Sequence, residues 1–597
     1  MFLLRFRAFN YFLLGAVLTG LTSCSTTGPN KAKSEPQTDL SPTVDFYKWA
    51  NSDWLKDTQI PSDKPGINNF VLIQKKVNED IVDLLGSLKK KQNQSPTEQK
   101  IAILYDSYMD VEKRNALGLS PLMPELRQID DAKTHADISV LFSRMQKLGV
   151  ESPLIFAVMT DFKNSDQYIV FVSQSGLGIE RDNYVGNDER SLNEQKLYRE
   201  VVQKLFEQAQ VKNAAAEAES VLKLEKGLAD IQWSKTENRQ MSKIYNVTDY
   251  NGLKSKANRL NIERQMVELG MPTTYAFNVM QPSYLDAFNR FFISQDVQTW
   301  KTYLKARLLL SYAKLLDKNF KAVMENYEIK RGLYEVEEPL SQQAVEYLNT
   351  NAGMLLGKTY VENKFNEGIK SKLEGIIKNI ADEYRIAINE SPRMTGETKK
   401  KAVEKLDKIT YKIGYPDKWQ DYSSLEPVAG ELVQNHKRIQ LYEHKRNLGK
   451  LGKPIDKNDW GYPPQVVNAF YELSSNSFVL LAAILYPPFF NPGGTDAEHY
   501  GGIGFVIGHE IGHGFDDQGS RFDGNGNMVN WWSPEDSKAY DKVKNALIAQ
   551  ANKYEILPGK YLKGELEIGE IMGDLSGAEI SLRAYQKIIK AKHLDEE

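Results

Sequence analysis

Two histidines one helical turn apart are the clearest sign of chemistry in this chain. They are His509 and His513, in the run His-Glu-Ile-Gly-His, with Glu510 beside the first. On a helix, residues at i and i+4 share one face, so both imidazoles would point the same way. This pattern suits Zn²⁺, which binds neutral imidazole nitrogen, keeps a water in its open position and lowers the pKa of that water to about 7. Glu510 would then lie close enough to take a proton from the water.

A second stretch supplies two carboxylates with the same spacing. Glu570 and Asp574 are four residues apart and would also share a helical face. One of them can be the third ligand, while the other can accept a hydrogen bond from a ligand imidazole and so set its orientation. Asp516 follows His513 by three residues and can do the same for that ring. The alternative for each acidic pair is an ordinary solvated helix face.

Another zinc architecture would place a third histidine six residues after the second. Gly519 stands at that position, and Asp516 stands where this architecture has a glycine. The sequence therefore excludes it and favours a ligand set of two histidines and a distant carboxylate.

Longer segments extend the pattern to most of the chain. They are YGGIGFVIGHEIGHGFDDQG from Tyr500, VVNAFYELSSNSFVLLAAILYPPFF from Val466, DFYKWANSDWL from Asp45 and KIGYPDKWQDYSSL from Lys412. Together with Glu570 to Asp574, these segments resemble the neprilysin and endothelin-converting-enzyme family of zinc metallopeptidases, including its bacterial oligopeptidase O branch. A thermolysin-like protease of another overall build would not account for the segment from Asp45.

The resemblance implies a role for each of these residues. The implied ligands of a single zinc ion are His509, His513 and Glu570. Glu510 would be the general base, and Asp574 would assist it by orienting a ligand histidine. Asp516 would orient the other histidine. The implied activity is that of an endopeptidase that hydrolyses oligopeptides with metal-activated water.

Asn468 and Ala469 match the family's substrate-binding strand. There an asparagine side chain and main-chain groups hold an extended peptide, which is a form of strand addition. The residues alone, from Val466 to Tyr471, predict only a β-prone segment, and a buried structural strand is the alternative. A substrate that must lie extended along this edge would be an oligopeptide rather than a folded protein.

The carboxyl-terminal part of the family pattern has no counterpart in this sequence. In the family, a histidine that stabilises the oxyanion and an arginine that binds the substrate carbonyl lie beyond the position of Glu597. His593 comes too early and stands in the charged run KAKHLDEE. We therefore expect the sequence to be a truncated record of a longer enzyme. The alternative is a catalytically impaired, lipid-anchored peptide-binding protein of the same fold.

Periodicity in the rest of the chain predicts a mainly α-helical protein with minor β structure. Leu197, Val201 and Leu205 recur at helical spacing. Two short segments rich in β-branched and aromatic residues, 154–158 and 168–173, predict strands. The resemblance implies two largely helical lobes that enclose a chamber, with a thermolysin-like zinc site in the catalytic lobe.

Composition is that of an ordinary globular protein. Of the 597 residues, 41% are hydrophobic and 26% are charged, and the net charge is −3. With no basic stripe and a pI near 6.3, a nucleic-acid partner is excluded. Polar segments rich in Pro and Gly divide the chain into a mostly helical peptidase domain at 44–430, a linker region at 431–464 and a catalytic domain at 465–597.

The amino-terminal residues predict a lipid anchor. Arg5 and Arg7 precede the apolar run 8–21, which is shorter than the ~20 residues that a transmembrane helix needs. The tetrapeptide that ends at Cys24 resembles the lipobox of bacterial lipoproteins, and Cys24 is the only cysteine. We therefore expect a signal peptide at 1–23, a polar tether at 24–43 and a protein held by lipid at Cys24 in the bacterial cell envelope.

Overall fold

A computed structural model describes residues 41–365, 367–557 and 559–592. The predicted signal peptide, Cys24 and the tether up to residue 40 lie outside these ranges. The described chain is mainly helical with small sheets, as predicted. None of the helices in these ranges is long and apolar enough to cross a membrane.

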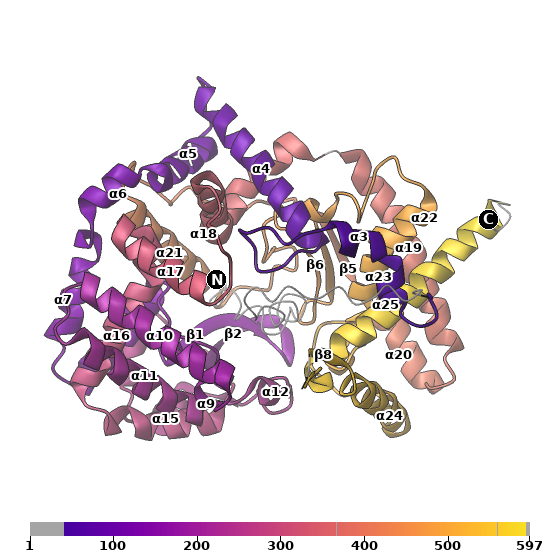
Figure 1. Cartoon of the computed structure of the whole chain (residues 1–597). Helices are drawn as coiled ribbons and strands as arrows, with labels where there is room; N and C mark the ends of the chain where they lie inside the picture. The colour runs from indigo at the N-terminus through magenta and orange to yellow at the C-terminus, as the bar shows by residue number, and fades with distance from the viewer. Residues whose placement is uncertain (1–40, 366, 558, 593–597) are drawn as a thin grey trace.

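Two lobes face each other across a central space (Figure 1). The first lobe holds most of the helices up to α17. Its helices are α5 (Pro96–Met109), α6 (Val111–Leu117), α7 (Met123–Asp131), α8 (His135–Lys147), α9 (Arg181–Val185), α10 (Glu189–Gln208), α11 (Ala214–Ile231), α13 (Tyr250–Lys256), α14 (Ile262–Leu269), α15 (Pro282–Ser294), α16 (Val297–Tyr312), α17 (Lys318–Lys330) and α21 (Leu432–Leu448). The short helix α12 (Lys235–Asn238) lies between the lobes at the lower edge of the view.

The second lobe contains the histidine motif. Its helices are α2 (Phe46–Ala50), α3 (Ser52–Asp57), α19 (Glu367–Glu390), α20 (Gly396–Asp407), α22 (Asp496–His499), α23 (Phe505–Gly512), α24 (Pro534–Ala551) and α25 (Gly564–Ala591). Two long helices, α4 (Asn69–Lys90) and α18 (Leu340–Lys364), pack together along the upper edge of the molecule and connect the lobes (Figure 1).

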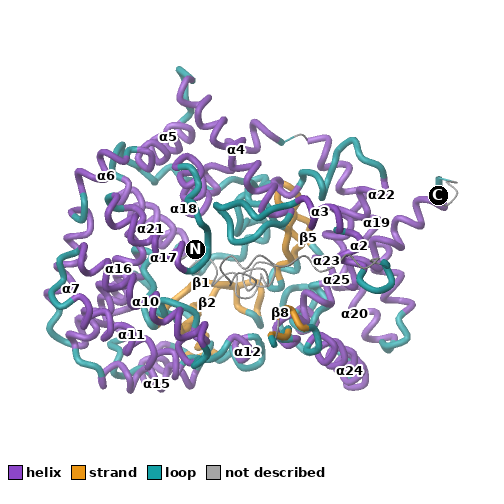
Figure 2. The backbone as a smooth tube through the Cα atoms, in the orientation of Figure 1, coloured by secondary structure: helices purple, strands orange, loops and turns teal. Residues whose placement is uncertain are grey.

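The strands lie next to the central space, and the helices form the outer walls (Figure 2). In the first lobe, β1 (Leu154–Asp161) and β2 (Asn164–Gln174) form a long hairpin at the positions predicted for strands. The hairpin extends through β4 (Phe277–Val279) to β3 (Val247–Thr248), in the order β1-β2-β4-β3. In the second lobe the order is β5-β7-β6, from β5 (Thr410–Gly414), β7 (Ser477–Leu481) and β6 (Ala469–Glu472). A small ribbon pairs β8 (Glu555–Leu557) with β9 (Lys560–Tyr561).

The lobes do not follow the sequence divisions at 430 and 465. β5 precedes residue 430, yet it pairs in parallel with β7 in the sheet of the second lobe. α19 also precedes residue 430 and packs against α23 and α25. Within the segment 431–464, which the composition marks as a linker, the structure forms the 17-residue helix α21. Parallel pairing requires a long crossover, so the chain returns to this sheet after a wide excursion.

The core of the first lobe is built on aromatic side chains. Phe142, Phe288, Phe292 and Trp300 are almost fully buried and contact one another at ring-centroid distances between 5.4 and 6.4 Å. Aromatic rings bury large apolar areas, so such a cluster dominates the packing energy around it. These rings therefore form the centre of the core of this lobe.

Candidate metal centre and active site

The two histidines lie at the end of a buried helix. α23 continues from a π-helical turn at Tyr500–Gly504, runs from Phe505 to Gly512, and is capped at its carboxyl end by His513. All of its residues from 506 to 512 are buried. A helix that is apolar on every side belongs in the interior of a protein. The motif is therefore set deep in the second lobe, and the charged Glu510 is carried inside with it.

Helix α25 packs closely against α23 because glycines lie on the face of α25 that contacts it. A Cβ at Gly573 would stand 2.8 Å from Cε1 of His509, and a Cβ at Gly577 would stand 2.8 Å from the carbonyl oxygen of Phe505. Neither position has room for a side chain. The close approach brings Glu570, one turn before Gly573, to the open side of both imidazoles.

Three ligand-type atoms converge between the two helices. Nε2 of His509 lies 3.0 Å from Nε2 of His513. Oε2 of Glu570 lies 3.5 Å from the first of these nitrogens and 3.8 Å from the second. Ligands at roughly 2.0–2.1 Å from a tetrahedral zinc ion stand about 3.3 Å apart, so this triangle fits such an ion. Glu510 also offers an oxygen, and with the two histidines it forms a set within 4.8 Å.

Carboxylates hold the far side of each imidazole. Nδ1 of His509 lies 2.9 Å from Oδ1 of Asp574, and Nδ1 of His513 lies 2.8 Å from Oδ2 of Asp516. The two Nε2 atoms face each other. When each Nδ1–H donates to its carboxylate, both Nε2 lone pairs are free to bind a cation between the rings.

The electrostatic environment favours positive charge at this point. Burial lowers the pKa of His509, but its hydrogen bonds to Asp574 and Glu570 outweigh burial and raise the pKa to about 10. Burial likewise lowers the pKa of His513, and the hydrogen bond and charge of Asp516 raise it to about 9. The carboxylates that would stabilise a proton here would stabilise a metal cation equally well.

Glu510 is a buried carboxylate with an unused oxygen. Its residue is 3% exposed, and no described group forms a hydrogen bond with its Oε2. Burial raises the pKa of Glu510, while the neighbouring His509 and His513 act in the opposite direction. An unpartnered buried acceptor is costly, and such groups cluster at functional sites. Glu510 is thus placed to accept a proton from a molecule that enters the site.

Lys405 supports the loop that follows the histidines, although no motif in the sequence marks this residue. This buried side chain comes from α20, and its Nζ donates to the carbonyl oxygens of Gly514, Gly519 and Phe522 at 2.6–2.7 Å. Burial lowers its pKa to about 7, against the charges of Asp516 and Asp523. In the sequence, Lys405 looks like one more surface lysine of a lysine-rich helix. Only the fold places it under the loop.

Asn468 and Ala469 lie where the predicted substrate strand begins. β6 is an edge strand, and α23 packs against it. The N–H of Leu481 donates to the carbonyl of Asn468 at 3.2 Å, so in antiparallel pairing the main-chain groups of Ala469 and Tyr471 point away from β7. Asn468 is 6% exposed, and its Oδ1 accepts the N–H of Ala469 at 2.9 Å. This edge therefore lies inside the molecule, next to the helix that carries Glu510.

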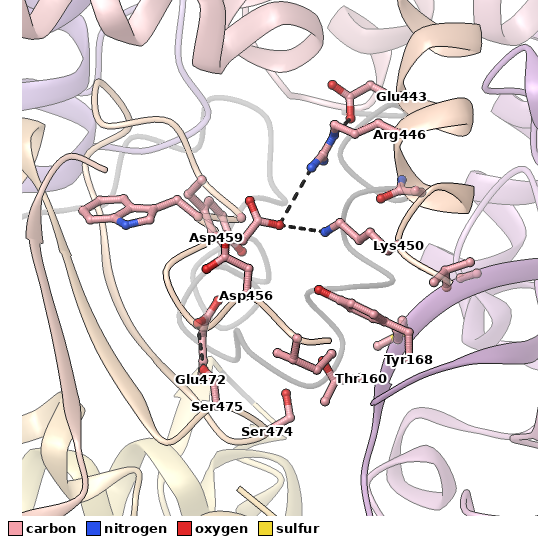
Figure 3. A pocket seen from close by; sticks show the side chains of 18 of the residues that line it. Thr160, Tyr168, Glu443, Arg446, Lys450, Asp456, Asp459, Glu472, Ser474 and Ser475 are labelled. Carbon is pink, nitrogen blue, oxygen red and sulfur yellow. Dashed lines mark hydrogen bonds and ion pairs between the residues drawn. The ribbon is translucent and has the colours of Figure 1, made fainter. Parts of the chain in front are cut away.

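Two cavities lie between the lobes, and neither is lined by His509 or His513. A cavity of about 280 Å³ is bounded by Thr160 and Tyr168 of the β1–β2 hairpin and by the turn from Glu472 to Ser475 (Figure 3). Lys450 and Asp459 also line this cavity and form an ion pair, with 2.8 Å between Nζ of Lys450 and Oδ2 of Asp459. The second cavity, of about 680 Å³, is lined by residues of both lobes, including Asp517 next to Asp516. The interlobe space thus reaches the edge of the metal centre.

Both halves of the chain match one family of peptidases. Residues 42–416 match the amino-terminal part of peptidase family M13, and residues 468–597 match its peptidase part. The chain is 26% identical to a neutral endopeptidase of Lactococcus lactis over 557 residues, which covers 90% of this chain and 87% of that protein. It is 27% identical to mouse neprilysin over 595 residues, with 92% and 79% coverage.

Solved structures of one bacterial enzyme match in two states. The inhibitor complex of the Mycobacterium tuberculosis zinc metalloprotease ZMP1 has 32% identity and a TM-score of 0.88, covering 93% of this chain and 86% of that chain. The open state of ZMP1 has the same identity and a TM-score of 0.73, with 92% and 87% coverage.

Fold, motif and relatives define the class of protein: this is a metalloendopeptidase. The chain belongs to peptidase family M13. The resemblance to the neprilysin family, stated above from the motifs, is confirmed.

Proposed function

We propose that this chain is a zinc-dependent endopeptidase that hydrolyses oligopeptides with metal-activated water. The observation that carries the proposal is the convergence of His509 Nε2, His513 Nε2 and Glu570 Oε2 beside the unpartnered oxygen of Glu510. Glu570 is preferred to Glu510 as the third ligand because it closes the triangle of distances that suits a tetrahedral ion, which leaves Glu510 free to act as the base.

The residues would divide the chemistry among them. Zinc held by the two histidines and Glu570 would polarise the scissile carbonyl and lower the pKa of the attacking water to about 7. Glu510 takes the proton of that water and passes it to the leaving amine. Asp516 and Asp574 keep the imidazoles in the tautomer that presents Nε2, and Asp574 supports catalysis in this way.

The substrate would bind as an added strand on β6. The outward main-chain groups of Ala469 and Tyr471 can pair with an extended peptide, and the Asn468 amide can turn from Ala469 towards that peptide. Since β6 packs against α23, a peptide in this position would lie next to the helix that carries Glu510. We further propose that the lobes open to admit it, as the open state of ZMP1 suggests by analogy.

Attachment to a membrane is a separate part of the proposal. The lipobox-like tetrapeptide that ends at Cys24 supports a lipid-anchored protein of the bacterial cell envelope. Incorporation of labelled fatty acid into the wild-type chain, and its absence in Cys24→Ser, would establish the anchor.

Glu510→Gln tests the catalytic proposal directly. This change removes the base but keeps the size of the side chain. Zinc content measured by atomic absorption should remain that of the wild type, while hydrolysis of an unstructured peptide should fall by about 10²–10⁴-fold. Removal of metal with a chelator should abolish wild-type hydrolysis, and added Zn²⁺ should restore it.

Two results would count against the proposal. Near wild-type turnover in Glu510→Gln would show that another group is the base. A wild-type chain that binds zinc and peptide without cleaving the peptide would support the alternative of a peptide-binding protein.

A further inference from the structure

Arg239 is a cationic side chain that the first lobe extends to the edge of the candidate metal centre. It directly follows α12, which is tied to the first lobe through the hydrogen bond from Gln281 to Asn238 at 2.8 Å. Nη2 of Arg239 donates to both carboxylate oxygens of Asp517, at 3.2 Å each. The two side chains are 17% and 15% exposed. The pair is therefore a mostly desolvated tie between the lobes rather than a surface ion pair.

The side chain of Gln518 is a second hydrogen-bond partner of the Arg239 guanidinium. With its amide oriented so that the oxygen faces Arg239, that oxygen accepts from Nη2 at 3.0 Å and from Nη1 at 3.2 Å. The backbone N–H of Gln518 donates to Oδ1 of Asp516 at 2.8 Å, and the other oxygen of Asp516 accepts from His513. Arg239 is thus connected to an imidazole of the metal centre through one short turn.

Arg239 also lies against the helix that carries Glu570. A Cβ at Gly569, the residue before Glu570, would stand 3.5 Å from Nη2 of Arg239 and 3.0 Å from Oδ2 of Asp516. The guanidinium therefore sits where the turn after α23 meets α25. The two segments that carry Asp516 and Glu570 meet at this junction.

We propose that Arg239 is a positioning residue that couples closure of the lobes to the geometry of the metal centre. By holding the turn at 516–518, it keeps Asp516 on His513 and fixes the spacing between that turn and Glu570. Because the segment that carries Arg239 is tied to the first lobe through Asn238, opening of the lobes would withdraw Arg239 from the turn. The centre is then complete only after the substrate is enclosed, which prevents chemistry in the open form. This inference rests on the proposed zinc peptidase function.

Arg239→Met is the principal test, because methionine fills much of the same space without charge or donors. We expect kcat to fall by about 10- to 100-fold with little change in KM, as for other groups that orient metal ligands. Zinc affinity, measured by competition with a chromophoric chelator in the presence of a non-cleavable peptide that keeps the lobes closed, should fall by about 10-fold or more. Wild-type kcat together with wild-type zinc affinity would overturn the proposal.

Ser165→Ala is the matched control for a contact between the lobes that does not reach the turn at 516–518. The hydroxyl of Ser165 in β2 donates to the carbonyl of Asn525 in the second lobe at 2.7 Å. Its loss should weaken closure and raise KM, while kcat and zinc affinity stay at wild-type values. An equal loss of kcat and zinc affinity in Ser165→Ala would show that Arg239 only holds the lobes together, and would overturn its positioning role.

Arg239→Lys covers the case in which the methionine variant does not fold. Lysine keeps the charge but lacks the planar fork that reaches Asp517 and Gln518 together. We expect an unchanged unfolding midpoint, while kcat and zinc affinity are still reduced. Wild-type values of kcat and zinc affinity would contradict the proposal.

Measurements on the wild-type chain distinguish a failure of the proposed zinc peptidase function from a failure of the role of Arg239. If it fails to bind zinc, the proposed function fails, whereas an active wild type with unaltered Arg239 variants refutes only the role of Arg239.

Discussion

The two aspartates that contact the histidines of the candidate metal centre differ in how strongly the surrounding structure holds them. Asp516 is 6% exposed and accepts hydrogen bonds from the N–H groups of Gln518 and Gly519 as well as from His513. Burial raises the pKa of Asp516, and these hydrogen bonds outweigh it and lower the pKa. The side chain of Asp574, by contrast, is 64% exposed while it contacts His509. Water can take over part of the role of Asp574 but not that of Asp516.

This contrast predicts different effects for two equivalent substitutions. Asp516→Asn removes a charged hydrogen-bond acceptor from a buried turn, so zinc affinity and kcat/KM should fall by about 100-fold. Asp574→Asn should lower the same two quantities by about 10-fold. Chelator competition and peptide hydrolysis measure the two effects. A larger loss in Asp574→Asn than in Asp516→Asn would contradict the argument from burial.

At the scale of elements, the contact between α23 and α25 decides whether Glu570 can reach the histidines. Gly573 has no room for a methyl group because its position faces the ring of His509. The sequence does contain a signal for this contact, since glycine recurs every four residues on α25, at Gly569, Gly573 and Gly577. The glycines thus have the same i and i+4 spacing as the carboxylates, and they mark the face of α25 that approaches α23.

Gly573→Ala should separate the two helices or turn the imidazole of His509. Helix propensity alone favours alanine, so any loss reports the close contact. We expect zinc affinity and the unfolding midpoint both to fall. Gly375→Ala on α19 is the control, because a Cβ there meets nothing within 4 Å. That variant should gain roughly 0.5–1 kcal/mol in unfolding free energy with unchanged zinc affinity. This account of the contact would be refuted if Gly573→Ala had the same unfolding midpoint and the same zinc affinity as the wild type.

At the scale of the whole molecule, enclosure between two lobes should select substrates by size. The cavities between the lobes measure about 280 and 680 Å³, and β6 lies inside. A folded domain of 100 residues has a radius of gyration of about 13 Å and cannot enter such spaces.

The same peptide sequence should therefore be cleaved when it is free and spared when it is embedded in a stable folded domain. Mass spectrometry of both digests, with the domain also tested after unfolding, measures the difference. Rapid cleavage inside the folded domain would show that access does not require the interlobe space.

Local spacing in the sequence was enough to predict which of the candidate site residues would lie together. The i and i+4 spacing of His509 and His513, and of Glu570 and Asp574, follows from helix geometry alone, and the structure brings all four side chains together. The mainly helical class and strands at 154–158 and 168–173 were predicted for a similar reason, because helical periodicity and residue composition are local properties. The pairing of the two strands as a hairpin is a finding of the structure.

Tertiary structure alone decided what holds these groups in place. Lys405 and Arg239 come from segments more than a hundred residues away from the turn after α23, and nothing near them in the sequence marks them as parts of the site. The pairing of β5 with β7, and the way the chain divides between the lobes, likewise depend on long-range packing. Spacing along one helix specifies which side chains share a face, whereas the partner of that face is chosen by burial and charge complementarity across the whole fold.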